Sequence, residues 1–129
     1  MAGIFSKIIS GDIPSYEVYE DNKHYAFLDI NPNSVGHTLC VPKKEIDRIF
    51  DLSREDFIRL IDFSRTVAIA IEKAIPCDRV GMSVIGLEVP HAHVHLIPLK
   101  KMEDATFQKK VSQTPEEFKK TASKIRKYL

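Results

Sequence analysis

Apolar and polar residues recur along this chain in patterns that predict three helices. Apolar residues at helical spacing followed by Gly11 predict a short helix over residues 4–9. A longer amphipathic helix begins after the N-cap residue Ser53 and ends at Pro76, with an apolar stripe of Phe57, Leu60, Ile61, Ser64, Val67, Ala68, Ile71 and Ile75. Thr114-Pro115-Glu116-Glu117 is a typical helix start, and the C-terminal helix that follows has a stripe of Phe118, Ala122, Ile125 and Leu129.

The segments between these helices are rich in β-formers and bounded by turn residues. They predict five strands, over residues 17–20, 25–29, 37–41, 79–85 and 92–99. Helices do not alternate regularly with strands, so the pattern favours an α+β fold with a mainly antiparallel sheet, one long helix and a C-terminal helix. The glycine motifs of dinucleotide-binding and P-loop folds are absent from the sequence.

Length and composition indicate a single folded domain over residues 1–129. Apolar residues make up 43% and charged residues 29% of the chain, the balance of a soluble globular protein. No apolar run is long enough to cross a bilayer, and residues 1–20 lack the features of a secretory signal. Cys40 and Cys77 are not in CxxC spacing, which predicts reduced thiols. We therefore expect a cytoplasmic protein with no membrane partner.

The net charge of +1 is unevenly distributed. Residues 100–129 contain nine Lys and Arg against four Asp and Glu, whereas residues 1–99 contain ten against fourteen. A basic tail attracts nucleic acid, but these lysines follow a helical pattern without interleaved aromatic residues. A solvated helix face is the better interpretation, and no nucleic-acid partner is expected.

The candidate chemistry lies in the histidines. His91, His93 and His95 alternate in a predicted strand and so share one face, while Ala92, Val94 and Leu96 face the apolar side. His37 opens another predicted strand. Two functions fit this arrangement: zinc or iron binding by a His-x-His pair, or phosphoryl or nucleotidyl transfer with an imidazole nucleophile. Composition and spacing do not separate them.

Residues 91–97 read His-Ala-His-Val-His-Leu-Ile and resemble the signature of the histidine-triad (HIT) proteins. The blocks at residues 4–14, 18–21, 26–32 and 36–43 resemble the same family in the same order, so the similarity covers residues 4–99. The chain is more similar to the HinT-type nucleotide-binding branch than to the galactose-1-phosphate uridylyltransferases.

This resemblance implies a fold, a reaction and a set of roles. The fold would be a homodimeric HIT-like α+β fold in which strands of two subunits form one continuous sheet. The substrate would be a purine nucleotide of the AMP or GMP type, hydrolysed at the α-phosphate through a nucleotidyl-histidine intermediate without metal or cofactor. His93 would be the nucleophile, with its other ring nitrogen held by a backbone carbonyl, and His95 would contact the α-phosphate and the leaving group.

The remaining roles follow from the same resemblance. His91 and His37 would support the other two histidines. Asp29 would accept the ribose hydroxyls. The base would lie in an apolar pocket of Ile4, Phe5, Ile8, Phe27, Ile30 and Leu39.

The chain departs from the family pattern in three places. The loop before the triad, residues 84–90, is short and carries Glu88 where a hydroxyl would touch the leaving group, so Glu88 is a candidate substrate contact. Gly3 and Ser6 replace the CxxC that holds a structural zinc in some relatives, so that zinc site is not expected. After a HIT core over residues 1–100, residues 101–129 read as a helical extension that packs on a dimer or covers the nucleotide.

The leading interpretation is therefore an enzyme that hydrolyses nucleoside phosphoramidates or related nucleotidyl substrates. Glu88 and the short loop keep open a second one, a nucleotide-binding HIT module with weak turnover that acts through protein contacts. A third is a hydrolase or phosphorylase of dinucleoside polyphosphates.

Overall fold

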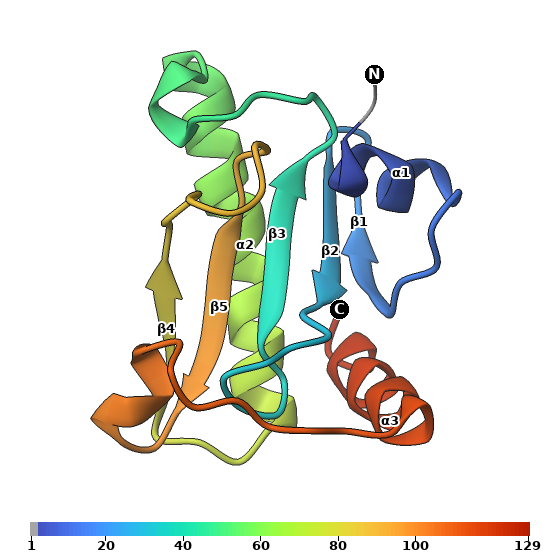
Figure 1. The fold of residues 1–129 in the computed structure, drawn as a ribbon, viewed down its shortest axis with the longest axis vertical. Helices are drawn as coiled ribbons and strands as arrows, with labels where there is room; N and C mark the ends of the chain where they lie inside the picture. The colour runs from blue at the N-terminus through green and yellow to red at the C-terminus, as the bar shows by residue number, and fades with distance from the viewer. Residues whose placement is uncertain (1–2) are drawn as a thin grey trace.

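A five-stranded antiparallel sheet forms the centre of the protein, which we describe over residues 3–129 in a computed structural model (Figure 1). The strand order is β1-β2-β3-β5-β4, and every neighbouring pair is antiparallel. The strands are β1 Glu17–Glu20, β2 His24–Leu28, β3 Thr38–Pro42, β4 Arg79–Ser83 and β5 Val94–Leu99. The predicted α+β fold with an antiparallel sheet is confirmed.

Helices cover both faces of this sheet. They are α1 Ile4–Ser10, η1 Ile49–Asp51, α2 Arg54–Ala74, η2 Met102–Ala105 and α3 Pro115–Arg126. Every residue of β2 and β3 is buried, because successive side chains enter two different clusters. Ala26 and Cys40 pack in the cluster formed with α2 and α3, whereas Phe27 and Leu39 face α1. The second face is covered over only part of its width, which leaves room for a cavity beside α1 (Figure 1).

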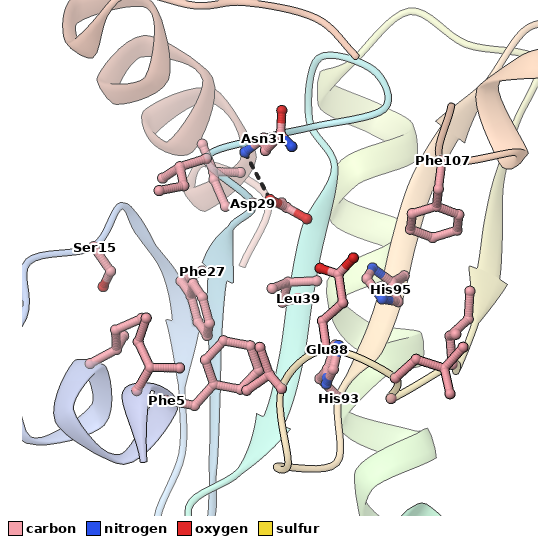
Figure 2. A pocket seen from close by; sticks show the side chains of 18 of the residues that line it. Phe5, Ser15, Phe27, Asp29, Asn31, Leu39, Glu88, His93, His95 and Phe107 are labelled. Carbon is pink, nitrogen blue, oxygen red and sulfur yellow. Dashed lines mark hydrogen bonds between the residues drawn. The ribbon is translucent and has the colours of Figure 1, made fainter. Parts of the chain in front are cut away.

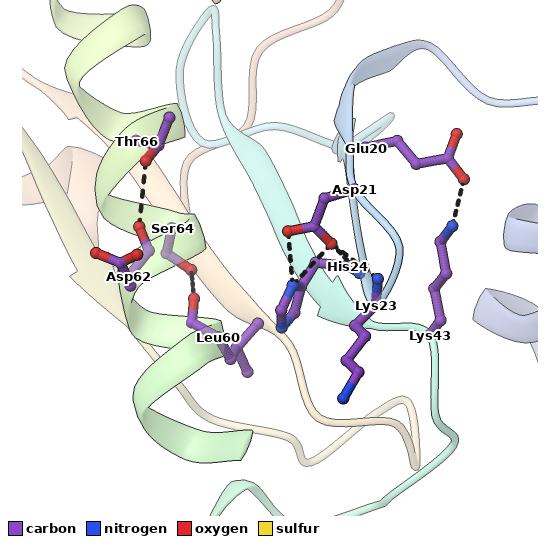
Figure 3. Close-up of polar contacts among 9 residues, drawn as sticks. All are labelled: Glu20, Asp21, Lys23, His24, Lys43, Leu60, Asp62, Ser64 and Thr66. Carbon is purple, nitrogen blue, oxygen red and sulfur yellow. Dashed lines mark hydrogen bonds and ion pairs between the residues drawn. The ribbon is translucent and has the colours of Figure 1, made fainter. Parts of the chain in front are cut away.

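The long helix α2 forms where its apolar stripe predicts. The Ser53 hydroxyl accepts a hydrogen bond from the Asp56 N–H at 3.1 Å, which satisfies one free donor of the first turn. The buried residues include Leu60, Val67 and Ile71 of the predicted stripe. Ser64 shares that buried face, where its hydroxyl donates to the Leu60 carbonyl at 2.8 Å (Figure 3). The polar side chain therefore enters the core with its hydrogen bond satisfied.

The C-terminal helix α3 packs on the same core as α2. Thr114 and Glu117 form the reciprocal capping box that the sequence predicts. Phe118, Ala122 and Ile125 are buried, and the Phe118 ring stacks on Tyr16 with centroids 4.9 Å apart. The helix ends at Arg126, so the prediction that Leu129 belongs to the stripe was wrong: Leu129 follows the last turn and is 37% exposed.

The turn between β1 and β2 is held by one carboxylate. Asp21 accepts hydrogen bonds from the backbone N–H groups of Lys23 and His24 at 2.8 and 2.7 Å, and also contacts the His24 ring nitrogen Nδ1 (Figure 3). The second strand consequently begins at His24, one residue before the predicted start. It ends at Leu28, which leaves Asp29 in the loop that follows.

The two cysteines, Cys40 and Cys77, are both free thiols. Burial raises the pKa of the Cys40 thiol to about 12. Cys40 therefore stays protonated and unreactive in the core.

Among the helices of residues 3–129, none has the length and apolar content needed to span a membrane.

Candidate functional site

The three alternating histidines do not all lie in a strand, so that part of the prediction was wrong. The strand β5 begins at Val94, and only His95 belongs to it. The chain before it bonds elsewhere: the His91 N–H donates to Val89, and the Ala92 N–H donates to the Ile46 carbonyl. The alternation nevertheless persists, because Ala92 and Val94 are 1% and 0% exposed in the α2 core while the histidines face away from it.

His93 has one ring nitrogen engaged by the backbone. Its Nδ1 lies 2.7 Å from the His91 carbonyl oxygen, which only accepts, so Nδ1 carries the proton. The other nitrogen, Nε2, therefore keeps its lone pair. The Phe5 ring packs against the imidazole at 5.2 Å and limits its rotation. The result is an oriented neutral imidazole with an available nucleophilic nitrogen in a cavity wall.

A chain of hydrogen bonds fixes the tautomers of His37 and His95. The Asn33 N–H donates to Nδ1 of His37 at 3.0 Å, so the proton of His37 is on Nε2. That Nε2–H lies 3.0 Å from Nδ1 of His95, which must accept it. His95 consequently holds its own proton on Nε2. Unlike His93, His95 is thus a hydrogen-bond donor at the cavity wall.

Burial keeps both of these imidazoles neutral. Desolvation is the main cause that lowers the pKa of His37 to about 3, with the charges of His95 and Lys110 adding to it. Desolvation, with the charges of His93 and Lys110, lowers the pKa of His95 to about 4. Near neutral pH, His95 therefore donates a hydrogen bond but has no second proton to transfer.

His91 lies behind the cavity. Its Nε2–H donates to the Pro42 carbonyl at 2.7 Å, while its Nδ1 is buried and has no hydrogen-bond partner. Nearby, Glu45 accepts hydrogen bonds from the Gly3 N–H at 2.7 Å and the Ser6 hydroxyl at 2.8 Å. A carboxylate thus connects the start of α1 to the segment after β3.

Most of the predicted site residues line one cavity of about 510 Å³. Its walls include ten of the twelve residues singled out from the sequence: Ile4, Phe5, Ile8, Phe27, Asp29, Ile30, Leu39, Glu88, His93 and His95. The other two, His37 and His91, contact His95 and His93 from behind. The size and the largely apolar walls suit a nucleotide-sized ligand. Ile4 and Ile30 are 49% and 73% exposed, so they lie at the cavity mouth rather than in its depth.

The cavity has two distinct ends (Figure 2). Phe5 and Phe27 lie at one end, with their rings in edge contact at 5.4 Å. Phe107 lies at the other end, beyond His95, and His93 and Glu88 lie between. Glu88 is exposed to solvent as well as lining the cavity.

Asp29 directly follows β2, and one of its carboxylate oxygens already accepts a hydrogen bond. Its Oδ1 accepts the Asn31 N–H at 2.8 Å, and its Oδ2 lies 3.6 Å from Nε2 of His37. Burial raises the pKa of Asp29, and the bond from Asn31 partly opposes that rise. The carboxylate retains free acceptor positions that face the cavity.

Asp29, His37 and His95 are the described residues that could hold a metal ion, since their ligand atoms all lie within 4.8 Å of one another. A metal on Nε2 of His37 would have to displace the proton that this nitrogen carries. The ring could not move that proton to Nδ1, because Nδ1 already accepts the Asn33 N–H. The hydrogen bonds of His37 therefore disfavour a metal ion at this cluster.

Several cavity residues were not anticipated from the sequence. Thr106, Phe107 and Lys110 come from the connection between η2 and α3, which crosses the wall beside His95. The expected helix does not cover the cavity, because α3 packs on the α2 side of the sheet. No periodicity marks residues 106–110, so only the tertiary structure brings them to the site.

Comparisons with known proteins identify the family. The family model described as HIT domain matches residues 10–102. An uncharacterized HIT-like protein of Borreliella burgdorferi is 34% identical, covering 95% of this chain and 94% of its own. Adenosine 5'-monophosphoramidase HNT1 of Saccharomyces cerevisiae is 35% identical over 75% of this chain and 62% of its own. Adenylylsulfatase HINT3 of Arabidopsis thaliana is 30% identical over 78% of this chain and 53% of its own.

Solved structures show the same fold. A HIT-like protein of Bartonella henselae involved in cell-cycle regulation superposes with a TM-score of 0.86 and 32% identity, covering 98% of this chain and 96% of its own. A zinc-bound histidine-triad family protein of Mycobacterium smegmatis superposes with a TM-score of 0.84 and 25% identity, over 99% and 93% of the two chains.

Proposed function

The chain belongs to the HIT family, and from that premise we propose that it is a purine nucleotide-binding hydrolase. It would cleave nucleoside phosphoramidates or related nucleotidyl substrates at the α-phosphate through a nucleotidyl-histidine intermediate. The observation that carries the proposal is the pair of opposite tautomers: His93 presents a lone pair and His95 an N–H in the same cavity. Relatives named as a monophosphoramidase and an adenylylsulfatase support nucleotide hydrolysis in general.

The ligand would lie along the cavity from its aromatic end to His95. The purine base fits between the apolar side chains at the Phe5 and Phe27 end. The ribose hydroxyls would donate to the free acceptor positions of Asp29. This pose places the α-phosphate at His93 and His95.

In the first step, the Nε2 lone pair of His93 bonds to the α-phosphorus. The bond from phosphorus to the leaving group breaks, and its electron pair departs with that group. The Nε2–H of His95 donates a hydrogen bond to the phosphoryl oxygens, where negative charge develops. His95 is neutral, so the proton that an amine leaving group needs would come from a carboxyl of the cavity wall. Asp29 would be engaged by the ribose, and we assign the proton transfer to Glu88, which lies between the two ends.

In the second step, water attacks the same phosphorus. The phosphorus–nitrogen bond breaks, its electron pair returns to Nε2 of His93, and the nucleoside monophosphate is released. Glu88, ionised by the first step, accepts the proton from the water. The His91 carbonyl holds the His93 ring in one orientation through both steps.

A panel of adenosine and guanosine phosphoramidates and dinucleoside polyphosphates, assayed with and without chelator, tests the proposal. We expect chelator-insensitive release of nucleoside monophosphate from the phosphoramidates. Chelator-sensitive turnover would count for the metal alternative. Tight nucleotide binding without turnover would instead support the binding module, for which the two carboxylates Asp29 and Glu88 beside the phosphate position are the structural reason.

Replacing Glu88 by glutamine is expected to act on one substrate class. Without an acid for the leaving nitrogen, kcat/KM for phosphoramidates should fall about 10- to 100-fold. Substrates whose leaving group is an anion should keep their rate or gain, because such a group leaves without a proton. Steady-state kinetics on both classes measure the difference. Equal rates for mutant and wild type on both would show that Glu88 only faces solvent.

We also propose that two copies of the chain join through β4. This strand is an edge of the sheet, and its backbone polar groups on one side have no partner strand in the single chain. Exposed apolar side chains continue from it into the next loop, with Met82, Ile85 and Leu87 at 48%, 48% and 89% exposure. Light scattering across micromolar concentrations should report twice the 14.7 kDa of one chain. A mass of one chain throughout would contradict this interface.

A further inference from the structure

The segment of residues 106–110, called the strap below, closes the end of the cavity that lies opposite the base position. Thr106, Phe107 and Lys110 line the cavity there. The rings of Phe107 and His95 form a T-shaped contact, with centroids 4.9 Å apart and planes at 78°, and the two side chains are neighbours in Figure 2. The strap therefore lies next to the histidine that would hydrogen-bond the phosphoryl group.

The buried residue Asn33 forms hydrogen bonds both to the strap and its neighbour Asp104 and to His37. Asn33 is 0% exposed, and its Nδ2 donates to the Asp104 carbonyl at 3.0 Å. Its Oδ1 accepts from Nζ of Lys110 at 2.8 Å, while its backbone N–H holds His37. The same residue thus holds the strap through its side chain and the hydrogen-bond chain of His37 and His95 through its backbone N–H.

The backbone of the strap adopts a costly conformation. Phe107 has φ of 64°, and it is the only non-glycine residue with positive φ in the part of the chain described here. A bulky side chain rarely adopts this left-handed conformation, and such strain persists mainly at ligand-binding sites. Contacts with His95 and with Lys110, whose Nζ lies 5.0 Å from the ring centre, hold Phe107 there.

Lys110 is a basic side chain in the cavity wall that has no carboxylate partner among the described residues. Among the lining residues, Lys110 is the lysine, with no arginine beside it, and Asp29 and Glu88 are the acidic residues. Lys110 is exposed, and no carboxylate of residues 3–129 forms an ion pair with it; its Nζ bonds only the neutral amide of Asn33. A flexible ammonium of this kind can move to an anion without breaking a salt bridge.

We propose that Lys110 binds the leaving group, and that it selects nucleotidyl substrates whose leaving group is an anion, such as sulfate, over those that release an amine. The assignment rests on the proposed function. With a phosphosulfate, His93 bonds to phosphorus, the phosphorus–oxygen bond to sulfate breaks, and the electron pair leaves with the sulfate dianion. That group leaves without needing a proton. Lys110 stabilises the departing charge by a charge-assisted hydrogen bond.

The test compares adenosine 5′-phosphosulfate with adenosine 5′-phosphoramidate. In Lys110→Met, the ratio of kcat/KM for the phosphosulfate to that for the phosphoramidate should fall about tenfold or more, the effect of one hydrogen bond to a charged group. Lys110→Arg should restore most of the ratio, because it keeps the charge. Lys109→Met is the matched control: this neighbouring lysine pairs with Glu103 at 3.3 Å and does not line the cavity. It should leave the ratio unchanged.

Two results would overturn the assignment. An equal loss for both substrates would place Lys110 on the α-phosphate that they share, and no loss would remove it from the site. If the wild type hydrolyses neither substrate, the proposed function fails, and binding then decides the role of Lys110. Calorimetry with AMP and adenosine 5′-phosphosulfate should show that Lys110→Met weakens only the phosphosulfate. If the ratio of the dissociation constant for adenosine 5′-phosphosulfate to that for AMP is the same in Lys110→Met and in the wild type, the inference is contradicted.

Discussion

Replacing His93 by alanine is expected to abolish turnover while the fold and nucleotide binding are largely retained. Loss of a covalent nucleophile lowers kcat by about three orders of magnitude or more in enzymes whose catalytic groups act as a unit. The fold should survive, because His93 makes one hydrogen bond, to His91, and its neighbour Phe5 keeps its contact with Phe27. Circular dichroism, calorimetric nucleotide titration and steady-state kinetics together measure this outcome.

His24→Ala is the matched control for that experiment. His24 is also a buried histidine, but it bonds Asp21 and stacks on Phe63, away from the cavity. Its loss should leave kcat unchanged. Acid-quenched wild-type protein with a slow substrate should carry the nucleotidyl group on His93. Residual activity of His93→Ala within about tenfold of wild type, or an adduct on His91 or His95, would reverse the assignment.

Acidification from pH 7 to pH 5 is expected to lower the free energy of unfolding through His37 and His95. Folding holds the pKa of His37 at about 3 and that of His95 at about 4, below the value of 6.5 for a free imidazole. In this window the unfolded chain binds more protons than the folded one, so stability falls as pH falls. Linkage gives up to about 4 kcal/mol for the two groups together. Urea unfolding at several pH values measures the slope.

A His95→Gln variant separates this effect from general acid denaturation. With one of the two groups removed, the fall between pH 7 and pH 5 should be roughly half that of the wild type. Asp29 contributes with the opposite sign, because its pKa is raised on folding. The comparison of variants cancels its contribution. An identical slope in wild type and variant would show that His95 does not titrate as its burial requires.

Local sequence patterns predicted most of the elements but not their ends. The period of α2 and the capping box of α3 are properties of short segments, so they could be found before any contact was known. The predicted ends were wrong where a residue far away in the sequence provides the hydrogen-bond partner. The predicted strand of the triad begins late because Ala92 bonds the Ile46 carbonyl instead of β3, and nothing near residue 92 in the sequence signals that bond.

The sequence by itself determined the chemistry available to this protein: three alternating imidazoles with apolar residues between them, and apolar and acidic residues upstream that match the family pattern. It did not determine which nitrogen of each ring carries a proton. That depends on the His91 carbonyl beside His93, and on the Asn33 N–H behind His37. Nor did it place Lys110 at the cavity. Hydrogen-bond partners and burial arise between segments far apart in sequence, so only the tertiary structure fixes tautomer, pKa and charge at the site.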